Sequence, residues 1–185
     1  MDAVLDKSVG VFRERGYHAT SIADLTEAME LASGSVYKAF KDKRAVFLAA
    51  FDREAIVRRE KLRRIISTAK SGRDRIRNVL TFYAESSHGV EGKRGCLIVG
   101  TAAELATLDA EVAQRVAAAL RKSETLLVDL IRQGQTDSSI PAAIDSKVTA
   151  RLMLCLVQGM RVIGKTGRKR KEMRTVADAA MKLLG

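Results

Sequence analysis

The stretch from Thr20 to Arg44 constrains this chain most, because it predicts two short helices joined by a tight turn. Apolar residues recur at helical spacing in the first half, and either Thr20 or Ser21 can cap the first helix. The second helix, expected from Ser33 to Phe40, begins with small residues and places Val36 on its buried face. Two short helices of this kind describe a helix-turn-helix, whose second helix enters the major groove of DNA.

The segments around this stretch complete a small helical core. Residues 2–15 predict an amphipathic helix that Gly16 ends and that packs across the helix-turn-helix. Tyr17 follows, and it either covers this core or reaches a DNA phosphate; core packing is the more usual role. Leu31 is expected to fill the turn between the two short helices.

The first quarter of the chain resembles the TetR-type transcriptional repressors through many fixed spacings. Met29-Glu30 stands where the family usually has Ala-Gly in the turn, so we expect Glu30 in a left-handed conformation. Ala32 and Ala39 replace a serine cap and a histidine of the family pattern. The residues that carry the resemblance are the run Val11–Ile22 (VFRERGYHATSI), Leu25, and the run Gly34–Ala45 (GSVYKAFKDKRA).

The resemblance, together with position on the second helix, predicts the residues that contact DNA. Tyr37 and Lys43 are expected to bind phosphates, whereas Ser33, Ser35 and Lys38 are expected near base edges. The full predicted set is Ser21, Ser33, Gly34, Ser35, Tyr37, Lys38 and Lys43. The expected partner is double-stranded DNA, bound at a palindromic operator.

The net charge of +11 is not concentrated in this region. Residues 1–60 hold ten basic and ten acidic side chains, so the predicted DNA-binding segment is neutral overall. Its basic groups cluster from Lys38 to Arg44, and such placement governs phosphate contact, whereas net charge supplies long-range attraction. A further basic run from Arg58 to Arg64 is either a DNA backbone contact or, more commonly for such runs, a solvated helix face.

The rest of the chain predicts further helices and no strands, which makes the fold class all-α. We expect a helix-turn-helix domain at residues 1–47, and a ligand-binding and dimerisation domain at residues 48–185. A long helix joins the two and is the rigid lever for any signal between them. The expected helices are about 42–70, 73–87, 96–106, 109–135, 145–164 and 172–184, with loops at 88–95 and 136–143.

The last two helices carry a surplus of apolar residues. They either bury this face against a second copy of the chain or use it as ordinary core. The resemblance implies a homodimer through a four-helix bundle, with the two DNA-reading helices about 34–36 Å apart or a multiple of that distance. The residues expected on the face are Leu152, Leu156, Gly159, Met160, Ile163, Val176, Ala180, Met181 and Leu183.

The resemblance also implies a ligand pocket among the later helices. Its mostly apolar lining predicts a small, mostly hydrophobic inducer, although the same residues would make an ordinary core. The candidates are Phe82, Tyr83, Ser86, Ile98, Ala102, Leu105 and Leu127.

The two cysteines form no disulfide framework and are consistent with a reducing cytoplasm. Cys96 follows Lys93 and Arg94 at an expected helix start, and both features lower the pKa of a thiol. It is either an electrophile or redox sensor, as some TetR-type regulators have, or a small buried residue. Cys155 is expected to pack in the core. No apolar run reaches the ~20 residues of a membrane span, and the first residues do not have the pattern of a signal peptide.

No motif of an enzyme is present, so we expect no catalytic residue, no cofactor and no metal. A zinc site from Cys96, Cys155 and His88 would need three scattered ligands. The alternative to a DNA-binding regulator is a helical protein that binds a partner protein. The Tyr and Lys spacing from Gly34 to Lys43 favours the regulator, because it suits phosphates.

Overall fold

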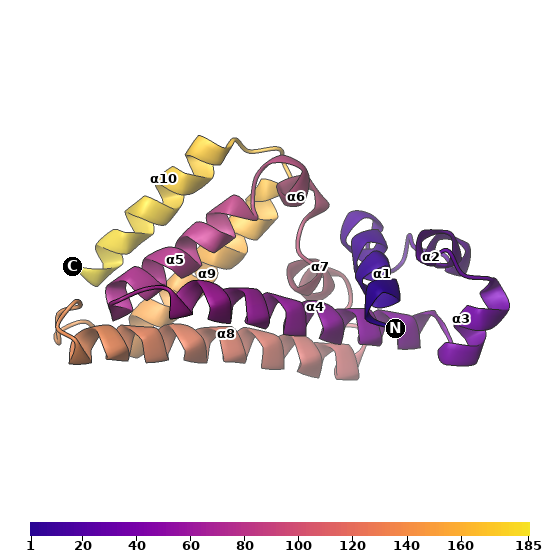
Figure 1. Ribbon diagram of the computed structural model, residues 1–185, viewed down its shortest axis with the longest axis horizontal. Coiled ribbons are helices and arrows are strands. Elements are labelled where there is room, and N and C mark those ends of the chain that lie inside the picture. The colour runs from indigo at the N-terminus through magenta and orange to yellow at the C-terminus, as the bar shows by residue number, and fades with distance from the viewer. The chain divides into compact units, whose positions relative to one another are not determined.

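The computed structural model describes all 185 residues, and it contains helices but no β-strand (Figure 1). No helix is both long and apolar enough to cross a membrane. The predicted all-α class, with a helix-turn-helix followed by a long helix, is confirmed. The helices are α1 (Asp2–Arg15), α2 (Ile22–Met29), α3 (Ser33–Ala39), α4 (Lys43–Ser67), α5 (Gly72–Glu85), α6 (Gly89–Arg94), α7 (Leu97–Glu104), α8 (Ala110–Thr136), α9 (Ser146–Gly164), α10 (Arg170–Ala180) and the 3-10 helix η1 (Met181–Leu184).

The chain forms two compact units, and each unit combines two separate stretches of sequence. Unit 1 comprises Met1–Arg59 and Cys96–Val116, and unit 2 comprises Glu60–Gly95 and Ala117–Gly185. Helices α4 and α8 each contribute residues to both units. The unit that contains the helix-turn-helix therefore extends beyond residue 47 and includes α7, because this helix packs against α1.

An aromatic cluster forms part of the core of unit 1. The rings of Phe12 and Phe47 meet edge to face with centroids 5.1 Å apart, and Tyr17 lies at the same distance from Phe47. Such edge-to-face pairs add to the stabilisation that comes from burying the rings. Leu25 of α2 and Val36 of α3 are 0% and 1% exposed, so each short helix is anchored by one apolar side chain.

Unit 2 has its own apolar core, in which α5 packs against α9 and α10 (Figure 1). Side chains from four elements are completely buried there: Ile76, Leu80, Ile131, Met153 and Leu184. The helix starts follow the sequence. Asp109 and Asp145 stand at the expected starts of the helices 109–135 and 145–164, and they cap α8 and α9: their carboxylates accept hydrogen bonds from backbone N–H groups in the first turns.

The predicted loop at residues 88–95 is wrong, because Gly89–Arg94 form the short helix α6. Its glycines suggested a loop, but Gly92 is needed for close packing. A Cβ on Gly92 would lie 2.6 Å from the carbonyl carbon of Ser87 and 3.2 Å from the carbonyl oxygen of Gly164 in α9. Glycine therefore lets α6 approach the end of α9.

Helix α9 leaves an apolar face uncovered within the chain. Its exposed members lie on one side of the helix and are Val148, Leu152, Cys155, Leu156, Val162 and Ile163. Cys155 is therefore exposed, and its predicted place in the core is wrong. The prediction that Met160, Ala180 and Met181 belong to the same face is also wrong, because they are at most 7% exposed and lie in the core of unit 2. Met160 follows the inward-facing Met153 and Val157 at helical spacing.

Candidate nucleic-acid interface

Helix α2 begins at a capping box built by Ser21 and Asp24. The Ser21 hydroxyl accepts a hydrogen bond from the backbone N–H of Asp24 (3.1 Å), and the backbone N–H of Ser21 donates to the Asp24 carboxylate (2.8 Å). The bond from the Ser21 backbone N–H is the main cause of a lowered pKa at Asp24. Ser21, a predicted DNA-binding residue, is exposed and also fixes the start of α2.

The turn between α2 and α3 contains the left-handed residue that the sequence predicts. Glu30 has φ 56° and ψ 41°, a conformation that costs a non-glycine residue roughly 1–2 kcal/mol. Backbone hydrogen bonds from Glu30 to Glu27 and from Leu31 to Thr26, both 3.1 Å, close the end of α2. Leu31 is 37% exposed, so the prediction that its side chain fills the turn is wrong.

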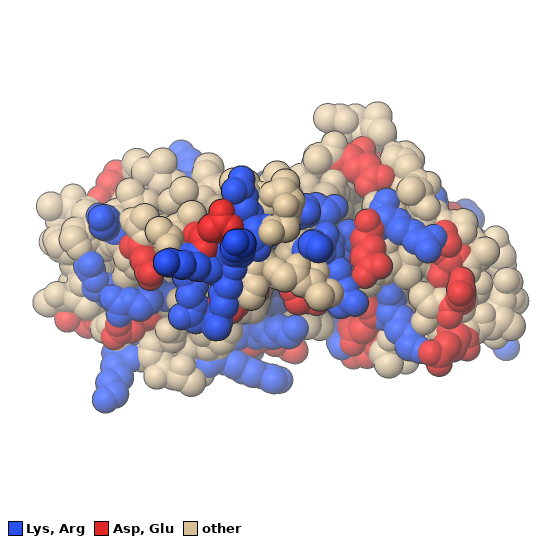
Figure 2. Space-filling view, turned by 90° about the horizontal axis from the view of Figure 1, so that it is seen from above, with Lys and Arg blue, Asp and Glu red and all other residues tan.

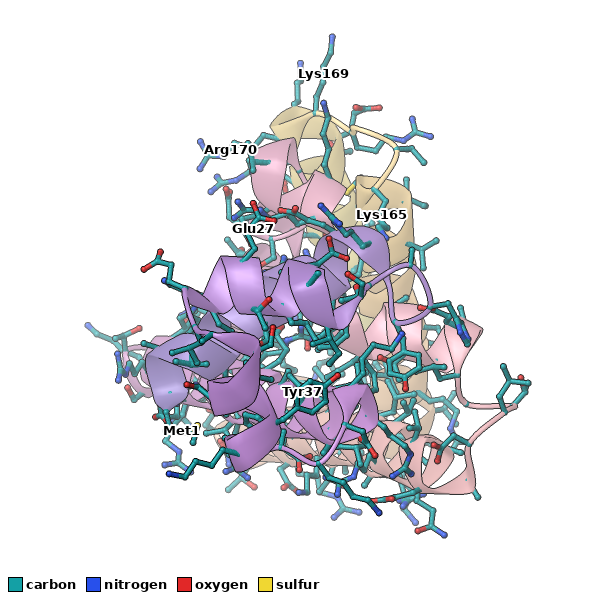
Figure 3. The ribbon with its side chains drawn as sticks, turned by 90° about the vertical axis from the view of Figure 1, so that its right-hand side faces the viewer. Met1, Glu27, Tyr37, Lys165, Lys169 and Arg170 are labelled. Carbon is teal, nitrogen blue, oxygen red and sulfur yellow. The ribbon has the colours of Figure 1, made fainter.

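Helix α3 turns most of its surface toward solvent. Ser33, Gly34, Ser35, Tyr37 and Lys38 are all exposed, and α3 therefore carries five of the seven predicted DNA-binding residues together. Figure 3 shows Tyr37 at the front of the view, and its side chain is 55% exposed. A Cβ on Gly34 would find no atom of the chain within 4 Å.

Lys43, a predicted phosphate ligand, holds the turn between α1 and α2. Its ammonium donates hydrogen bonds to the backbone carbonyl oxygens of Tyr17 (3.0 Å) and Thr20 (2.9 Å). It also lies 4.3 Å from the centre of the Tyr17 ring, within the range of a cation–π contact. Two of its three donors therefore serve the fold. Tyr17 itself belongs to the aromatic cluster, which agrees with the core packing that the sequence favours.

The same turn is held by a residue that the sequence did not single out. The Glu104 carboxylate, at the end of α7, accepts hydrogen bonds from the backbone N–H groups of Tyr17 (3.0 Å) and His18 (2.8 Å). Gly16 is adjacent, and a Cβ there would lie 2.7 Å from a Glu104 carboxylate oxygen. In the turn from Gly16 to Thr20, backbone N–H groups thus donate hydrogen bonds to the Glu104 carboxylate, and backbone carbonyl oxygens accept hydrogen bonds from the Lys43 ammonium.

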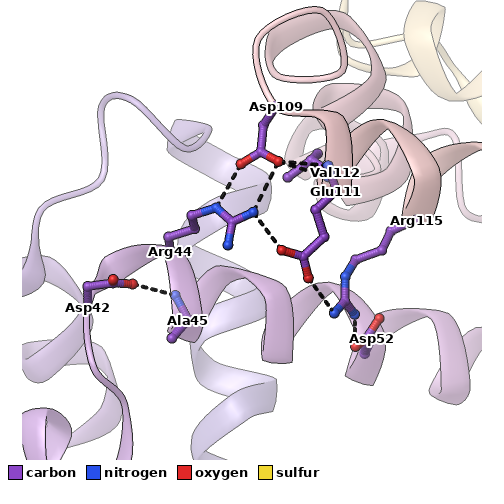
Figure 4. A network of polar contacts seen from close by, with 8 residues as sticks. All are labelled: Asp42, Arg44, Ala45, Asp52, Asp109, Glu111, Val112 and Arg115. Atoms are coloured by element: carbon purple, nitrogen blue, oxygen red, sulfur yellow. Dashed lines mark hydrogen bonds and ion pairs between the residues drawn. The ribbon is translucent and has the colours of Figure 1, made fainter.

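A network of ion pairs joins the start of α4 to the start of α8 (Figure 4). Arg44 donates to Asp109 through Nε (2.7 Å) and Nη2 (3.1 Å), and to Glu111 through Nη2 (2.7 Å). Arg115 continues the network to Glu111 and Asp52. The hydrogen bonds from Arg44, and then those from backbone N–H groups of α8, lower the pKa of Asp109 to about 2. A predicted member of the DNA-binding basic cluster, Arg44, is thus engaged within unit 1.

The seven residues predicted to line a ligand pocket divide between the two units. Phe82, Tyr83, Ser86 and Leu127 belong to unit 2, whereas Ile98, Ala102 and Leu105 belong to unit 1. Tyr83 and Leu127 are buried members of the core of unit 2. Phe82 of α5 and Ser86, the residue that follows α5, are partly buried, and the Ser86 hydroxyl donates to the Phe82 carbonyl (2.8 Å).

Cys96 is the residue that immediately precedes α7, in agreement with its predicted position at a helix start, and it forms no disulfide. The side chain is only 5% exposed. Such burial limits the access of a reagent to the thiol. The exposed cysteine of the chain is Cys155.

No group of three or more His, Cys, Asp or Glu side chains is arranged to hold a metal ion. The two histidines do not make a catalytic pair. His18 is exposed in the turn after α1, and His88 contacts the Glu85 carboxylate through Nε2 at 3.0 Å. The exposed face of α3 is therefore the best candidate for a functional surface in unit 1.

Family models match most of the chain. Residues 4–50 match the family described as bacterial regulatory proteins, tetR family. Residues 72–180 match the family described as tetracyclin repressor-like, C-terminal domain. The first match covers the helix-turn-helix, and the second runs from the start of α5 to the end of α10.

Individual relatives agree with these matches. The chain is 24% identical to the HTH-type transcriptional repressor ComR of Escherichia coli over 184 residues, which are 98% of this chain and 87% of ComR. It is 26% identical to the repressor DhaR of a Mycobacterium species over 175 residues, 92% of this chain and 84% of DhaR. A cysteine mutant of the TetR-family regulator CifR, solved with 26-base-pair operator DNA, is 28% identical with a TM-score of 0.84, covering 98% of this chain and 95% of CifR.

Proposed function

Because this chain belongs to the TetR family of bacterial regulatory proteins, we propose that it is a ligand-responsive transcriptional repressor that binds a palindromic operator as a homodimer. The observation that carries the proposal is α3, which one buried side chain anchors and whose other residues face solvent. A helix with such an exposed polar surface fits the major groove of DNA. The operator complex of CifR supports a duplex partner. In this proposal residues 1–47 bind DNA, and residues 48–185 bind the ligand and form the dimer.

The exposed residues of α3 suggest two kinds of DNA contact. Ser33, Ser35 and Lys38 carry hydroxyl and ammonium groups that suit base edges, whereas the Tyr37 hydroxyl suits a phosphate oxygen. Lys43 has one donor left for a phosphate beside its two bonds to the turn. Its main contribution is then to hold the turn that precedes α2.

The substitution Gly34→Ala tests the α3 surface without disturbing the fold. The added methyl group meets no atom of the chain, and alanine in a helix is more stable than glycine by roughly 0.5–1 kcal/mol. The same methyl group would stand between the α3 backbone and the duplex. We expect the melting temperature to hold or rise, while affinity for the DNA upstream of the chain's own gene falls by about tenfold or more.

A matched control is Gly100→Ala in α7, where an added Cβ also finds no atom within 4 Å. It should leave DNA affinity in a gel shift unchanged. Equal affinities of the wild type and both variants would remove α3 from the DNA interface. The variant Tyr37→Phe separately tests the phosphate contact, because it keeps the ring and removes only the hydroxyl.

The uncovered face of α9 supports the homodimer. Val148, Leu152, Leu156, Val162 and Ile163 are between 37% and 54% exposed, and their spacing forms one continuous stripe. A contiguous apolar face of this kind marks an interaction site. The outward residues of α10, by contrast, include Arg174, Thr175 and Asp178, so α9 contributes most of the apolar contact.

The substitution Leu152→Arg tests this interface, because an unpaired charge in a buried contact is strongly destabilising. Sedimentation at micromolar concentration should give a dimer for the wild type and a monomer for this variant. Leu108→Arg is the matched control, since Leu108 is a 72% exposed leucine outside α9. A dimer that persists in Leu152→Arg would place the interface elsewhere.

A small, mostly hydrophobic inducer is proposed for unit 2. Phe82 of α5 and Ser86 just after it are partly buried, and the Gln158 side-chain oxygen on α9 is buried without a hydrogen-bond donor. A mostly apolar site with few polar groups suits such a ligand. An apolar compound that binds should raise the melting temperature and weaken operator binding together. Compounds that raise the melting temperature without any effect on DNA would argue against a ligand switch.

A further inference from the structure

The two units differ sharply in charge. Unit 1, which contains the helix-turn-helix, holds 11 basic and 12 acidic side chains, a net charge of −1. Unit 2 holds 22 basic and 10 acidic side chains, a net charge of +12. The long-range attraction that this chain exerts on a polyanion therefore comes from unit 2.

Much of this charge lies on one surface of unit 2, formed by α6, the loop after α9 and the first turns of α10. We call it the α6–α10 basic surface. Figure 2, seen from the side on which α6 and α10 lie in Figure 1, shows Lys and Arg side chains gathered on this face. Its members are Lys93, Arg94, Lys165, Arg168, Lys169, Arg170, Lys171 and Arg174, and all are exposed.

Contacts between distant segments hold this surface together. The Lys165 side chain lies against Gly95, where a Cβ would be 2.7 Å from its Cε. The Arg161 guanidinium, which is 4% exposed, donates to the Gly95 carbonyl at 2.6 Å. A Cβ on Gly167 would lie 3.6 Å from the Lys93 Cε, so the Lys93 side chain of α6 lies beside the loop after α9.

The three carboxylates on this surface are already paired. Glu85 accepts from Arg170 (3.0 Å) and Arg174 (2.7 Å) and contacts His88, and these hydrogen bonds, with that of His88 the strongest, lower the pKa of Glu85 to about 2. Glu91 pairs with Arg94 at 3.2 Å and Glu172 with Arg168 at 3.3 Å. Four lysines remain without an ion pair: Lys93, Lys165, Lys169 and Lys171. Figure 3 shows Lys169 extending away from the ribbon.

The composition of the surface selects its partner. Residues 85–94 and 165–174 contain no Phe, Tyr or Trp, so bases have no stacking platform, and single-stranded nucleic acid is disfavoured. Val90 is the only large apolar side chain that is strongly exposed there, at 68%, whereas protein interfaces and membrane anchors need an apolar core. The ammonium groups of the four lysines without an ion pair match the regularly spaced phosphates of a duplex.

We propose that the α6–α10 basic surface binds the phosphate backbone of double-stranded DNA, independently of base sequence. This is a second nucleic-acid contact, separate from α3 and distinct from operator recognition. It contributes affinity through counterion release, and each phosphate that it neutralises adds about 0.9 to the slope of log affinity against log salt concentration. The surface thus gives the chain the affinity for bulk DNA that the neutral unit 1 does not provide.

A variant that removes only the four lysines without ion pairs tests the proposal: Lys93→Gln, Lys165→Gln, Lys169→Gln and Lys171→Gln together. The matched control removes four exposed lysines scattered over unit 2, which also have no ion pair: Lys61→Gln, Lys122→Gln, Lys147→Gln and Lys182→Gln. Both variants lose the same total charge. Fluorescence anisotropy then measures the affinity for a short mixed-sequence duplex without operator, between about 50 and 200 mM NaCl.

We expect the surface variant to lower the salt slope by roughly 2 to 4 and the affinity by about tenfold or more, and the scattered control to change the slope by less than about 1. Equal losses in the two variants would overturn the proposal, because net charge would then explain binding. Polyglutamate that displaces the duplex as well as unlabelled duplex does, at equal charge, would also overturn it in favour of an acidic protein. The probe lacks an operator, so failure of operator recognition by α3 would not alter the outcome.

Discussion

Replacing Glu104 by alanine removes the carboxylate that holds the turn before α2. That carboxylate accepts hydrogen bonds from the backbone N–H groups of Tyr17 (3.0 Å) and His18 (2.8 Å). A hydrogen bond to a charged group contributes about 1.5–3 kcal/mol when it is well buried. The bond to Tyr17 is partly buried and the bond to His18 is exposed, so each contributes less than this range, and we take about 2 kcal/mol for the pair.

Urea and thermal denaturation measure this loss directly. For a chain of this size about 2 kcal/mol corresponds to a fall of roughly 4–8 °C in the melting temperature. Glu104→Gln should lie between the wild type and Glu104→Ala, because the amide keeps one acceptor oxygen but loses the charge.

The matched control is Glu27→Ala in α2, an exposed carboxylate of the same unit that makes no ion pair. It should change the melting temperature by less than about 1 °C, as expected for a surface substitution. If Glu104→Ala is no more destabilising than Glu27→Ala, water replaces the carboxylate at no cost, and the argument for this turn fails.

Three further outcomes are expected. The pKa of Asp109 is lowered from an ordinary 3.8 to about 2, so its contribution to stability is complete above pH 3.8 and is lost as the pH falls through about 2. In Asp109→Asn, the free energy of unfolding should therefore fall less steeply between about pH 4 and pH 2 than in the wild type. With a thiol reagent, Cys155 should react in the native chain, and its reaction should become faster when dilution dissociates the proposed dimer, whereas the buried Cys96 should react only after unfolding. Single Cys→Ser variants assign each reaction to its cysteine. Gly92→Ala should lower the melting temperature because its methyl group meets backbone at 2.6 Å, whereas Gly100→Ala should raise it.

The parts of the fold that sequence predicted well depend on local chemistry. The caps of α8 and α9 are set by Asp109 and Asp145, which bond N–H groups only two or three residues away. The left-handed Glu30 was expected from the family resemblance, because the family usually has a glycine at this position of the turn. The exposed face of α3 was predictable in the same way. Helical spacing places Val36 on the buried side of this short helix and leaves the other residues exposed.

The parts that sequence missed depend on contacts between distant residues. Glu104 lies 87 residues from Tyr17, and no pattern near either residue indicates that they meet. Met160 and Leu156 are both apolar residues of α9, but one faces the core and the other solvent, and only the packing of α5 and α10 decides between them. The glycine-rich composition around Gly92 is also ambiguous, because glycine both ends helices and permits their close approach.

Unit 1 gives α7 a direct physical connection to the helix-turn-helix. Glu104 at the end of α7 bonds the turn before α2, and Asp109, five residues further on, bonds Arg44 at the start of α4. Any displacement of α7 relative to α1 must therefore lengthen or break the hydrogen bonds from Tyr17 and His18. Since α7 begins immediately after Cys96 and carries Ile98 and Ala102, a change at those side chains reaches the turn through one short helix. A change at these side chains can then reach the turn before α2 without any movement of α4. Glu104→Ala would separate the route through α7 from the route along α4, because it breaks the hydrogen bonds of α7 to the turn and leaves α4 intact.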